Sequence, residues 1–187
     1  PAPFFLYFAP VAVHELITPS AEGQGSSKAG PYGDFIHDLD HSVGRILAAL
    51  DNQNALANTL VIFTADNGCA PYIGVQDLEK MGHYPSSPLR GYKADAWEGG
   101  HRVPFIAHWP AGGWNQRHVS DTLCHAVDIV PTLLEITGAK KPDAVTLDGL
   151  SIRRLLDPTG DARDWPHNRI LVTDSQRVRD PIKWKQT

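Results

Sequence analysis

The pattern of hydrophobic and polar positions along the chain predicts strands that alternate with helices. Two short runs, Phe4–Phe8 and Leu60–Thr64, are apolar almost throughout, which is typical of strands buried on both faces of a sheet. Val103–His108 is a third expected strand and Thr122–Val127 a fourth. Buried strands separated by helices indicate an α/β sheet covered on both sides.

Two segments have the periodicity of helices. From Asp34 to Leu50 apolar residues recur at intervals of three and four, which predicts an amphipathic helix with Asp34 as its N-cap. A second helix is expected to start at its cap, Asp128, and to stop at Gly138, because glycine suits the end of a helix. The segment between Pro19 and Pro31 is rich in Gly, Ser and Pro and predicts a surface loop.

The pattern changes after Asp148, where loop-like segments precede a last expected strand, Ile170–Thr173. We therefore expect residues 1–148 to form part of one domain and residues 149–187 to start a small C-terminal subdomain. The chain begins with an apolar run and no initiator Met, and it ends close to an aromatic residue. These ends lead us to expect a fragment of a longer protein.

Composition excludes several classes of protein. The 187 residues are 42% hydrophobic and 20% charged, as in ordinary globular proteins, and the net charge of −4 gives no basic footprint for nucleic acid. The longest nearly apolar stretch, residues 4–13, is too short for a membrane span and is broken by Pro10. Two cysteines, Cys69 and Cys124, exclude a disulfide-dense scaffold and a four-cysteine zinc site, and leave the redox compartment open.

Polar residues follow the expected strands, at the edge where ligands of open α/β sheets bind. Asp66 and Asn67 offer a carboxylate and an amide oxygen, which suit Ca²⁺ or Mg²⁺, but two oxygens are too few to hold either ion. The same residues with the following glycine also form an ordinary tight turn. Lys93 lies in a loop, either presenting a cation to an anion or simply solvated. His14 follows the first strand, either as a catalytic group or as hydrogen-bonded packing.

The order of several segments resembles the sulfatase family, within the alkaline-phosphatase-like superfamily. The resemblance covers most of residues 4–138 and rests on Phe4–Tyr7 with His14, Asp40, Val43–Leu47, Asn58–Gly68, Gly91–Lys93, Trp97–Pro104, Trp109-Pro110 and Asp128–Leu134. It implies part of an alkaline-phosphatase-like α/β sandwich, with a central mixed, mostly parallel sheet flanked by helices.

The resemblance also implies a role for each matching residue. Asp66 and Asn67 match the second pair of calcium ligands, and Lys93 matches the lysine that holds the sulfate and the departing oxygen. His14 matches a histidine that contacts the sulfate ester and assists the leaving group, although the usual His-x-Pro spacing is absent here. The loop Tyr72–Arg90 is expected to set the choice of substrate, and His83 within it is either a substrate contact or a surface residue.

Two further residues, Glu98 and Arg102, are expected to brace the loop that carries Lys93. Two elements of the family do not occur in these residues: the cysteine that becomes formylglycine and the early aspartate pair of the calcium site. Cys69 is followed by Ala70-Pro71 but by no arginine, so we interpret it as structural. We therefore expect no nucleophile in this chain, an incomplete Ca²⁺ site, and no activity from residues 1–187 alone.

The resemblance implies a parent enzyme that hydrolyses sulfate monoesters of aryl compounds or sulfated glycans, in the periplasm or outside the cell. No export signal is visible in these residues. One alternative is a phosphate or phosphonate monoester hydrolase of the same superfamily, and another is a non-catalytic relative that binds anions or carbohydrate. A third is an assembly module that self-associates through an exposed sheet edge.

Overall fold

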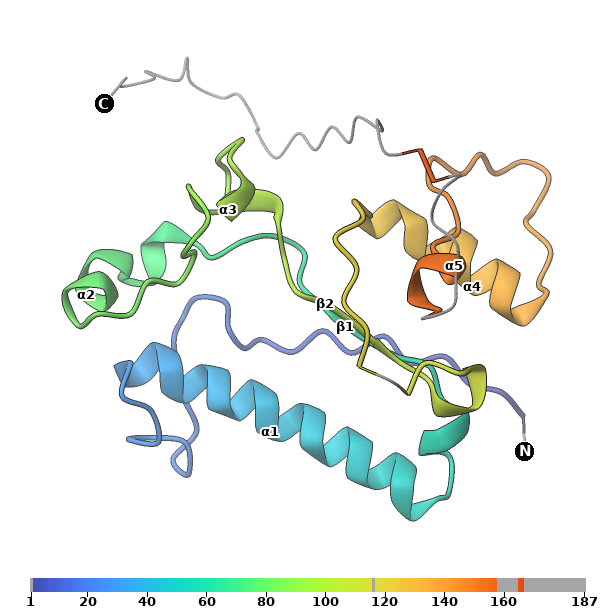
Figure 1. The fold of residues 1–187 in the computed structure, drawn as a ribbon. Helices are drawn as coiled ribbons and strands as arrows, with labels where there is room; N and C mark the ends of the chain where they lie inside the picture. The colour runs from blue at the N-terminus through green and yellow to red at the C-terminus, as the bar shows by residue number, and fades with distance from the viewer. Residues whose placement is uncertain (1, 116, 158–164, 167–187) are drawn as a thin grey trace. The chain divides into compact units, whose positions relative to one another are not determined.

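A computed structural model of the chain describes residues 2–115, 117–157 and 165–166 (Figure 1). The chain divides into two compact units, each interrupted in sequence by part of the other. Unit 1 comprises Pro1–Ala57 and Asn67–Arg102, and unit 2 comprises Asn58–Asp66 and Val103–Thr187. A short 3₁₀ turn, η1 (Leu56–Asn58), lies where the chain first passes from unit 1 to unit 2.

The main element of unit 1 is helix α1 (Gly30–Asn52), which confirms the helix predicted from the apolar stripe (Figure 1). It begins four residues before Asp34, and a proline in its first turn costs no hydrogen bond there. Asp34 is therefore not the N-cap, and this prediction was wrong. Its buried carboxylate instead accepts hydrogen bonds from the backbone amides of Gly25 (2.9 Å) and Ser27 (2.7 Å).

A second carboxylate of α1 holds the same loop. Asp38 accepts a hydrogen bond from the backbone amide of Ser20 at 2.6 Å and another from its hydroxyl at 2.7 Å. The hydrogen bonds to Asp34 and Asp38 lower the pKa of both carboxyl groups below the usual value. The predicted loop after Pro19 is thus confirmed as far as Ala29, and α1 anchors it at two points.

The remaining regular elements of unit 1 are short: η2 (Pro71–Ile73), α2 (Val75–Lys80) and α3 (Glu98–His101). The predicted buried strand Phe4–Phe8 is wrong for the described structure, where the segment has no regular secondary structure. Its five side chains are between 48% and 82% exposed. A strand needs hydrogen-bonding neighbours, and among the described residues none pairs with this run.

Unit 2 contains the two paired strands, β1 (Val61–Thr64) and β2 (Phe105–His108), which confirm two of the predicted strands with shorter bounds. They run antiparallel, with Val61 opposite His108 and Thr64 opposite Phe105. In the described part of the chain this is the whole sheet, whereas a mixed, mostly parallel sheet was expected. The difference arises because neither of the other two predicted strands forms a ladder.

The predicted strand Thr122–Val127 was also wrong. The segment has no strand and runs into a 3₁₀ turn, η4 (Ala126–Asp128). Another such turn, η3 (Pro110–Gly112), follows β2. The predicted second helix is confirmed as α4 (Ile129–Thr137), and Gly138 ends it with a φ of 68°, which is the left-handed conformation that glycine adopts easily.

Asp128 directly precedes α4, as predicted, but its side chain makes no cap hydrogen bond to the helix. The fully buried carboxylate accepts hydrogen bonds from the backbone amides of His125 and Leu150, each at 2.8 Å. One turn further on, the hydroxyl of Thr132 donates to the carbonyl of Asp128 (2.6 Å) and accepts from the amide of Ile152 (2.9 Å). Both groups therefore attach residues 149–152 to α4.

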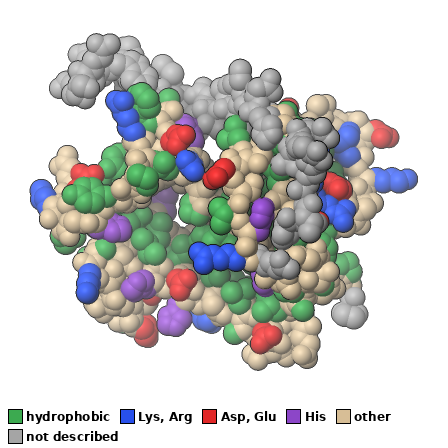
Figure 2. Space-filling view, viewed as in Figure 1, with side chains coloured by type: hydrophobic (Ala, Val, Ile, Leu, Met, Phe, Trp, Pro, Cys, Tyr) green, Lys and Arg blue, Asp and Glu red, His purple; other side chains and the backbone are tan. Residues whose placement is uncertain are grey.

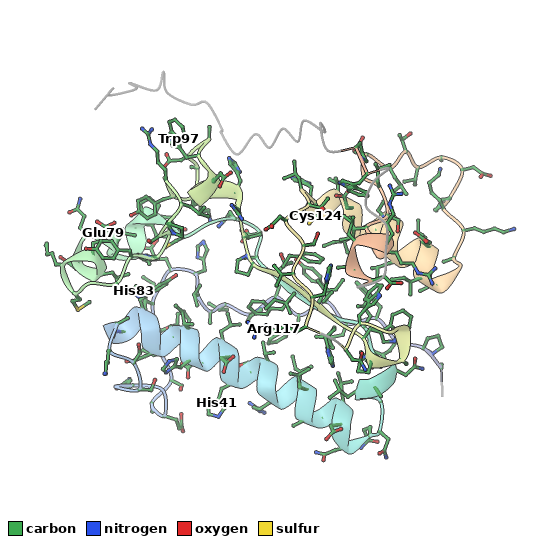
Figure 3. The ribbon with its side chains drawn as sticks, viewed as in Figure 1. His41, Glu79, His83, Trp97, Arg117 and Cys124 are labelled. Carbon is green, nitrogen blue, oxygen red and sulfur yellow. The ribbon has the colours of Figure 1, made fainter. Side chains whose placement is uncertain are left out.

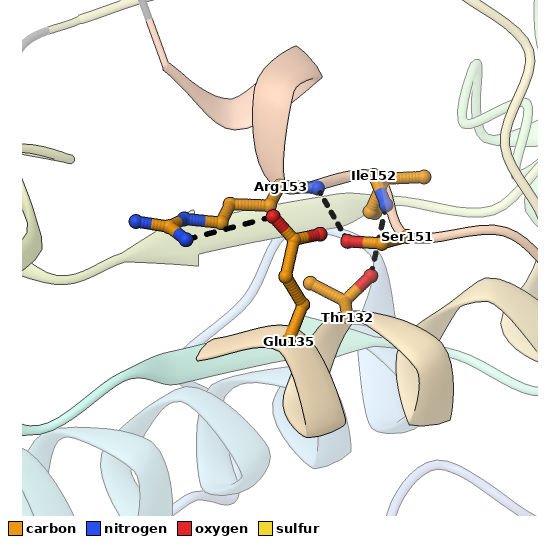
Figure 4. Close-up of polar contacts among 5 residues, drawn as sticks. All are labelled: Thr132, Glu135, Ser151, Ile152 and Arg153. Carbon is orange, nitrogen blue, oxygen red and sulfur yellow. Dashed lines mark hydrogen bonds and ion pairs between the residues drawn. The ribbon is translucent and has the colours of Figure 1, made fainter. Parts of the chain in front are cut away.

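The segment after Ile152 packs on α4 as helix α5 (Arg153–Leu156), where Arg153 pairs with Glu135 at 3.5 Å (Figure 4). The small core beside it consists of Ile152, Leu155 and Trp165, whose indole donates to a backbone carbonyl at 3.1 Å. The predicted strand Ile170–Thr173 lies outside the described residues, and the boundary at residue 148 stays a prediction.

On the face drawn in Figure 2, the acidic and basic side chains of described residues are interspersed rather than gathered by sign. This agrees with the modest net charge of −4. Within the described ranges, no helix is both long and apolar enough to cross a bilayer.

Candidate functional site

The loop that carries Lys93 is joined to the segment after Asn67 by backbone hydrogen bonds. The amide of Lys93 donates to the carbonyl of Cys69 at 2.7 Å, and the amide of Gly68 donates to the carbonyl of Gly100 at 3.0 Å. Both contacts lie within unit 1. Residues 67–69 therefore form a fixed backbone support for the predicted sulfate-binding lysine.

Glycine is required where these segments meet. A Cβ on Gly68 would overlap the carbonyl oxygen of Gly99, and a Cβ on Gly100 would overlap that of Asp95. The obstacles are backbone atoms, which cannot move aside as a flexible side chain can. This explains the glycines of the Asp-Asn-Gly and Glu-Gly-Gly elements by close packing.

The side chain of Lys93 is half-buried, and its ammonium has no hydrogen-bond or ion-pair partner among the described residues. Its neighbours are fixed on both sides. Two hydrogen bonds hold Tyr92. Its backbone amide donates to the carboxylate of Asp95 at 2.9 Å, and its hydroxyl donates to the carboxylate of Glu79 at 2.5 Å. The bond to Glu79 raises the pKa of Tyr92 to about 12, so this phenol stays protonated and keeps its hydrogen bond well above neutral pH.

Asp66 and Asn67 follow β1 after Ala65, and the chain passes from unit 2 to unit 1 between them. Asp66 is exposed, and its carboxylate makes no hydrogen bond or ion pair with the part of the chain that the structure describes. Asn67 donates its amide nitrogen to the carbonyl of Gly68 at 3.0 Å, which leaves its amide oxygen as an acceptor. The donor chemistry fits a hard cation such as Ca²⁺, which needs six or more oxygens. The described residues contain no group of three or more His, Cys, Asp or Glu placed to hold a metal, so further ligands are required.

His14 lies on an exposed loop of unit 1, where a residue far along the sequence holds its ring. Nδ1 is 2.8 Å from the carbonyl oxygen of the adjacent Glu15, and Nε2 is 3.2 Å from the hydroxyl of Tyr72. The two rings meet edge to face, with centroids 6.0 Å apart. Sequence reasoning missed Tyr72, because nothing in the spacing of residues 14 and 72 indicates a contact.

His83, the weakest of the predicted substrate contacts, follows α2 (Figure 3). It lines a cavity of about 420 Å³ together with Ser27, from the loop before α1, and His37, from α1 itself. Tyr72 and Tyr92 line a different cavity of about 520 Å³. The structure therefore brings Tyr72 and Tyr92 to one cavity and places His83 at another.

The remaining predicted residues have local partners. Glu98 and Arg102 form an exposed ion pair of 3.2 Å across α3, within the loop region they were expected to brace. The thiol of Cys69 lies 3.8 Å from the hydroxyl of Tyr32, and burial raises the pKa of this thiol. A protonated, half-buried thiol agrees with the structural interpretation of Cys69.

Comparisons with known proteins give the family. The Sulfatase family model matches residues 1–139. Bovine arylsulfatase A is 39% identical over 162 residues, which cover 84% of this chain and 29% of that protein. Rat N-acetylgalactosamine-6-sulfatase is 38% identical over 151 residues, which cover 81% of this chain and 28% of that protein. Human steryl-sulfatase is 33% identical over 185 residues, which cover 97% of this chain and 30% of that protein.

A solved structure supports the same conclusion. It comes from work on a versatile core genetic locus for the metabolism of multiple glycosaminoglycans in Bacteroides thetaiotaomicron, and it matches with a TM-score of 0.74 and 32% identity. The match covers 82% of this chain and 32% of that one, and it supports an alkaline-phosphatase-like α/β fold. The chain spans less than a third of the length of these relatives. Across the greater part of its length, this chain belongs to the sulfatase family.

Proposed function

We propose that the protein carrying this chain hydrolyses sulfate monoesters, and that this chain supplies Lys93 and His14 to the ester and Asp66 and Asn67 to a calcium ion. The observation that carries the proposal is the pair of contacts on residues 69–72. Cys69 fixes the backbone of Lys93, and Tyr72 contacts the ring of His14. One short segment that begins directly after Asn67 therefore attaches two of the proposed ester-binding groups.

The chemistry of these side chains supports a role with a tetrahedral anion. The half-buried ammonium of Lys93 is a compact positive charge that binds an ester oxygen and stabilises negative charge on the departing oxygen. The imidazole of His14 can donate a proton toward the leaving group. Neither role requires a group other than these two side chains.

Calcium, when bound through Asp66 and Asn67, supplies charge neutralisation at the sulfate oxygens. In this proposal the remaining calcium ligands and the nucleophile, a formylglycine, come from residues outside this sequence. A preparation of residues 1–187 alone is therefore expected to release no product from an aryl sulfate, with or without calcium.

The names of the relatives support the substrate class. They refer to aryl and steryl sulfates and to 6-sulfated N-acetylgalactosamine. We accordingly propose an aryl sulfate or a sulfated sugar as substrate, and a periplasmic or extracellular location.

The test is a set of parallel assays on the complete protein that contains this chain. Hydrolysis of p-nitrophenyl sulfate is expected, with loss on chelation of calcium and recovery when calcium is restored. Faster turnover of p-nitrophenyl phosphate or a phosphonate monoester would instead establish the related hydrolase. Binding of a sulfated sugar without turnover of any ester would establish a non-catalytic relative.

A further inference from the structure

The ring of His14 has one nitrogen whose proton is fixed by the backbone. Nδ1 lies 2.8 Å from the carbonyl oxygen of Glu15, and a carbonyl oxygen only accepts hydrogen bonds. Nδ1 must therefore carry a proton in both the neutral and the charged imidazole. In the neutral ring Nε2 is then an unprotonated acceptor.

The hydroxyl of Tyr72 lies at this second nitrogen, 3.2 Å from Nε2. A hydroxyl both donates and accepts, so it donates to Nε2 of the neutral ring and accepts from Nε2–H of the charged ring. The edge-to-face contact between the rings, at 61° between their planes, restricts rotation of the imidazole as well. Tyr72 can thus hold His14 in either protonation state.

Tyr72 is itself fixed. It lies in the middle of η2, where the amide of Ile73 donates to the carbonyl of Ala70 at 3.3 Å. The turn begins two residues after Cys69, whose carbonyl holds the Lys93 amide at 2.7 Å. His14, by contrast, is exposed on a loop without regular structure, and the described residues offer its side chain no other hydrogen-bond partner.

We propose that Tyr72 is a positioning residue for His14: its hydroxyl bonds Nε2 and its ring packs against the imidazole, so that the Nδ1–H ring anchored on Glu15 is held in one orientation. This inference rests on the proposed function for its meaning in the reaction, but the hydrogen bond at Nε2 is measurable without any turnover. Part of the Tyr72 ring is exposed, at 47%, and lines the cavity of about 520 Å³. His14 is not among the residues that line this cavity, and Tyr72 connects it to the cavity wall.

The test compares the wild-type protein with Tyr72→Phe, which keeps the ring and removes only the hydroxyl. Nitrogen-15 NMR of labelled histidine, with His14→Gln to identify the signal, is expected to show the Nδ1–H form in both proteins, because the carbonyl of Glu15 fixes that proton. The Nε2 signal should move in Tyr72→Phe to the position of an imidazole nitrogen without a hydrogen bond. Tyr7→Phe is the matched control, because its side chain is also exposed and its hydroxyl has no contact with His14 among the described residues.

In the complete protein, kcat on p-nitrophenyl sulfate should fall by roughly fivefold in Tyr72→Phe with little change in KM, and Tyr7→Phe should match the wild type. An Nε2 signal that does not move in Tyr72→Phe, or a moved signal with unchanged kcat, would overturn the inference. A wild-type protein with no sulfate-ester turnover would overturn the proposed function instead, and the Nε2 signal would still decide whether Tyr72 holds His14.

Discussion

Lys93 is held to Cys69 by a backbone hydrogen bond of 2.7 Å, while its side chain has no partner among the described residues. The backbone contact of Lys93 is thus independent of its side chain. The main-chain hydrogen bond fixes the loop, and the half-buried ammonium is the group that we propose for the ester. A substitution that removes only the side chain should consequently affect activity without affecting the fold.

We expect Lys93→Ala to lower kcat for sulfate esters by about a hundredfold, since one preorganised charge at the developing oxyanion contributes about that much. The melting temperature should stay close to that of the wild type. Lys80→Ala is the control, because Lys80 is exposed and pairs only with Asp77 at 2.7 Å. Retention of activity within threefold in Lys93→Ala would remove this lysine from the site.

Gly68→Ala tests the backbone contact beneath the site. The added methyl group would overlap the carbonyl oxygen of Gly99, so the variant should lose about 1–3 kcal/mol of unfolding free energy, measured with denaturant. Gly44→Ala offers the reverse control. Gly44 lies inside α1 with nothing within 4 Å of a built Cβ, and alanine there should gain about 0.5–1 kcal/mol. Equal effects at the two positions would contradict the close packing of Gly68.

Because the pKa of Asp34 is lowered in the folded protein, we expect the stability of the fold to depend on pH. Backbone hydrogen bonds from Gly25 and Ser27 are chief among the groups that lower the pKa of its carboxyl group below 3.8. A lowered pKa in the folded state stabilises the fold above the unfolded value, and this contribution is lost as pH falls through the folded value. Asp34→Asn should therefore lower the melting temperature at pH 7, and the difference from wild type should shrink below about pH 3.8.

Asp40→Asn is the control for this series, because Asp40 lies on the same helix with an exposed side chain. It should leave the melting temperature unchanged across the pH range. If Asp34→Asn differed from wild type by the same amount at pH 7 and at pH 2.5, the anchoring carboxylate would not be the cause.

We expect the hydrogen bonds of Thr132 to stabilise the attachment of residues 149–152 to α4. Thr132→Val keeps the shape of the side chain but removes both its hydrogen bonds, and it leaves the buried amide of Ile152 without its acceptor. A loss of about 1–3 kcal/mol is expected in chemical denaturation. Thr137→Val removes an exposed hydroxyl that bonds only to nearby backbone, the carbonyl of Leu133 and the amide of Ala139, and it should cost much less. Similar losses from both variants would contradict the attachment of residues 149–152 to α4.

The sequence predicted the helices better than the strands, for a physical reason. A helix satisfies its own backbone, so the apolar stripe sufficed to find α1, and Gly138 sufficed to find the end of α4. A strand depends on partners far away in the chain, and an apolar run such as Phe4–Phe8 does not reveal whether they are present. The start of α1 was missed because its first residues, glycine and proline, have the composition of a loop.

The candidate site was predictable in part. Motif order singled out Asp66, Asn67, Lys93 and His14, and their roles stay predictions. The groups that hold them were not predictable, because they depend on three-dimensional proximity. Neither the carbonyl of Cys69 nor the hydroxyl of Tyr72 has a sequence signature. The position of Asp34 suggested a helix cap, but its carboxylate binds the backbone of the loop before α1.

The contact between Gly68 and Gly100 is made by backbone atoms alone, through a hydrogen bond and close packing. No side chain contributes to this contact, so it does not depend on the exposed side chains of the neighbouring segment between residues 72 and 90. A library confined to that segment, with Tyr72 and Glu79 kept, can therefore vary its side chains while leaving the backbone support of Lys93 intact. For protein engineering, the backbone contact is a constant support beside a segment that can be exchanged.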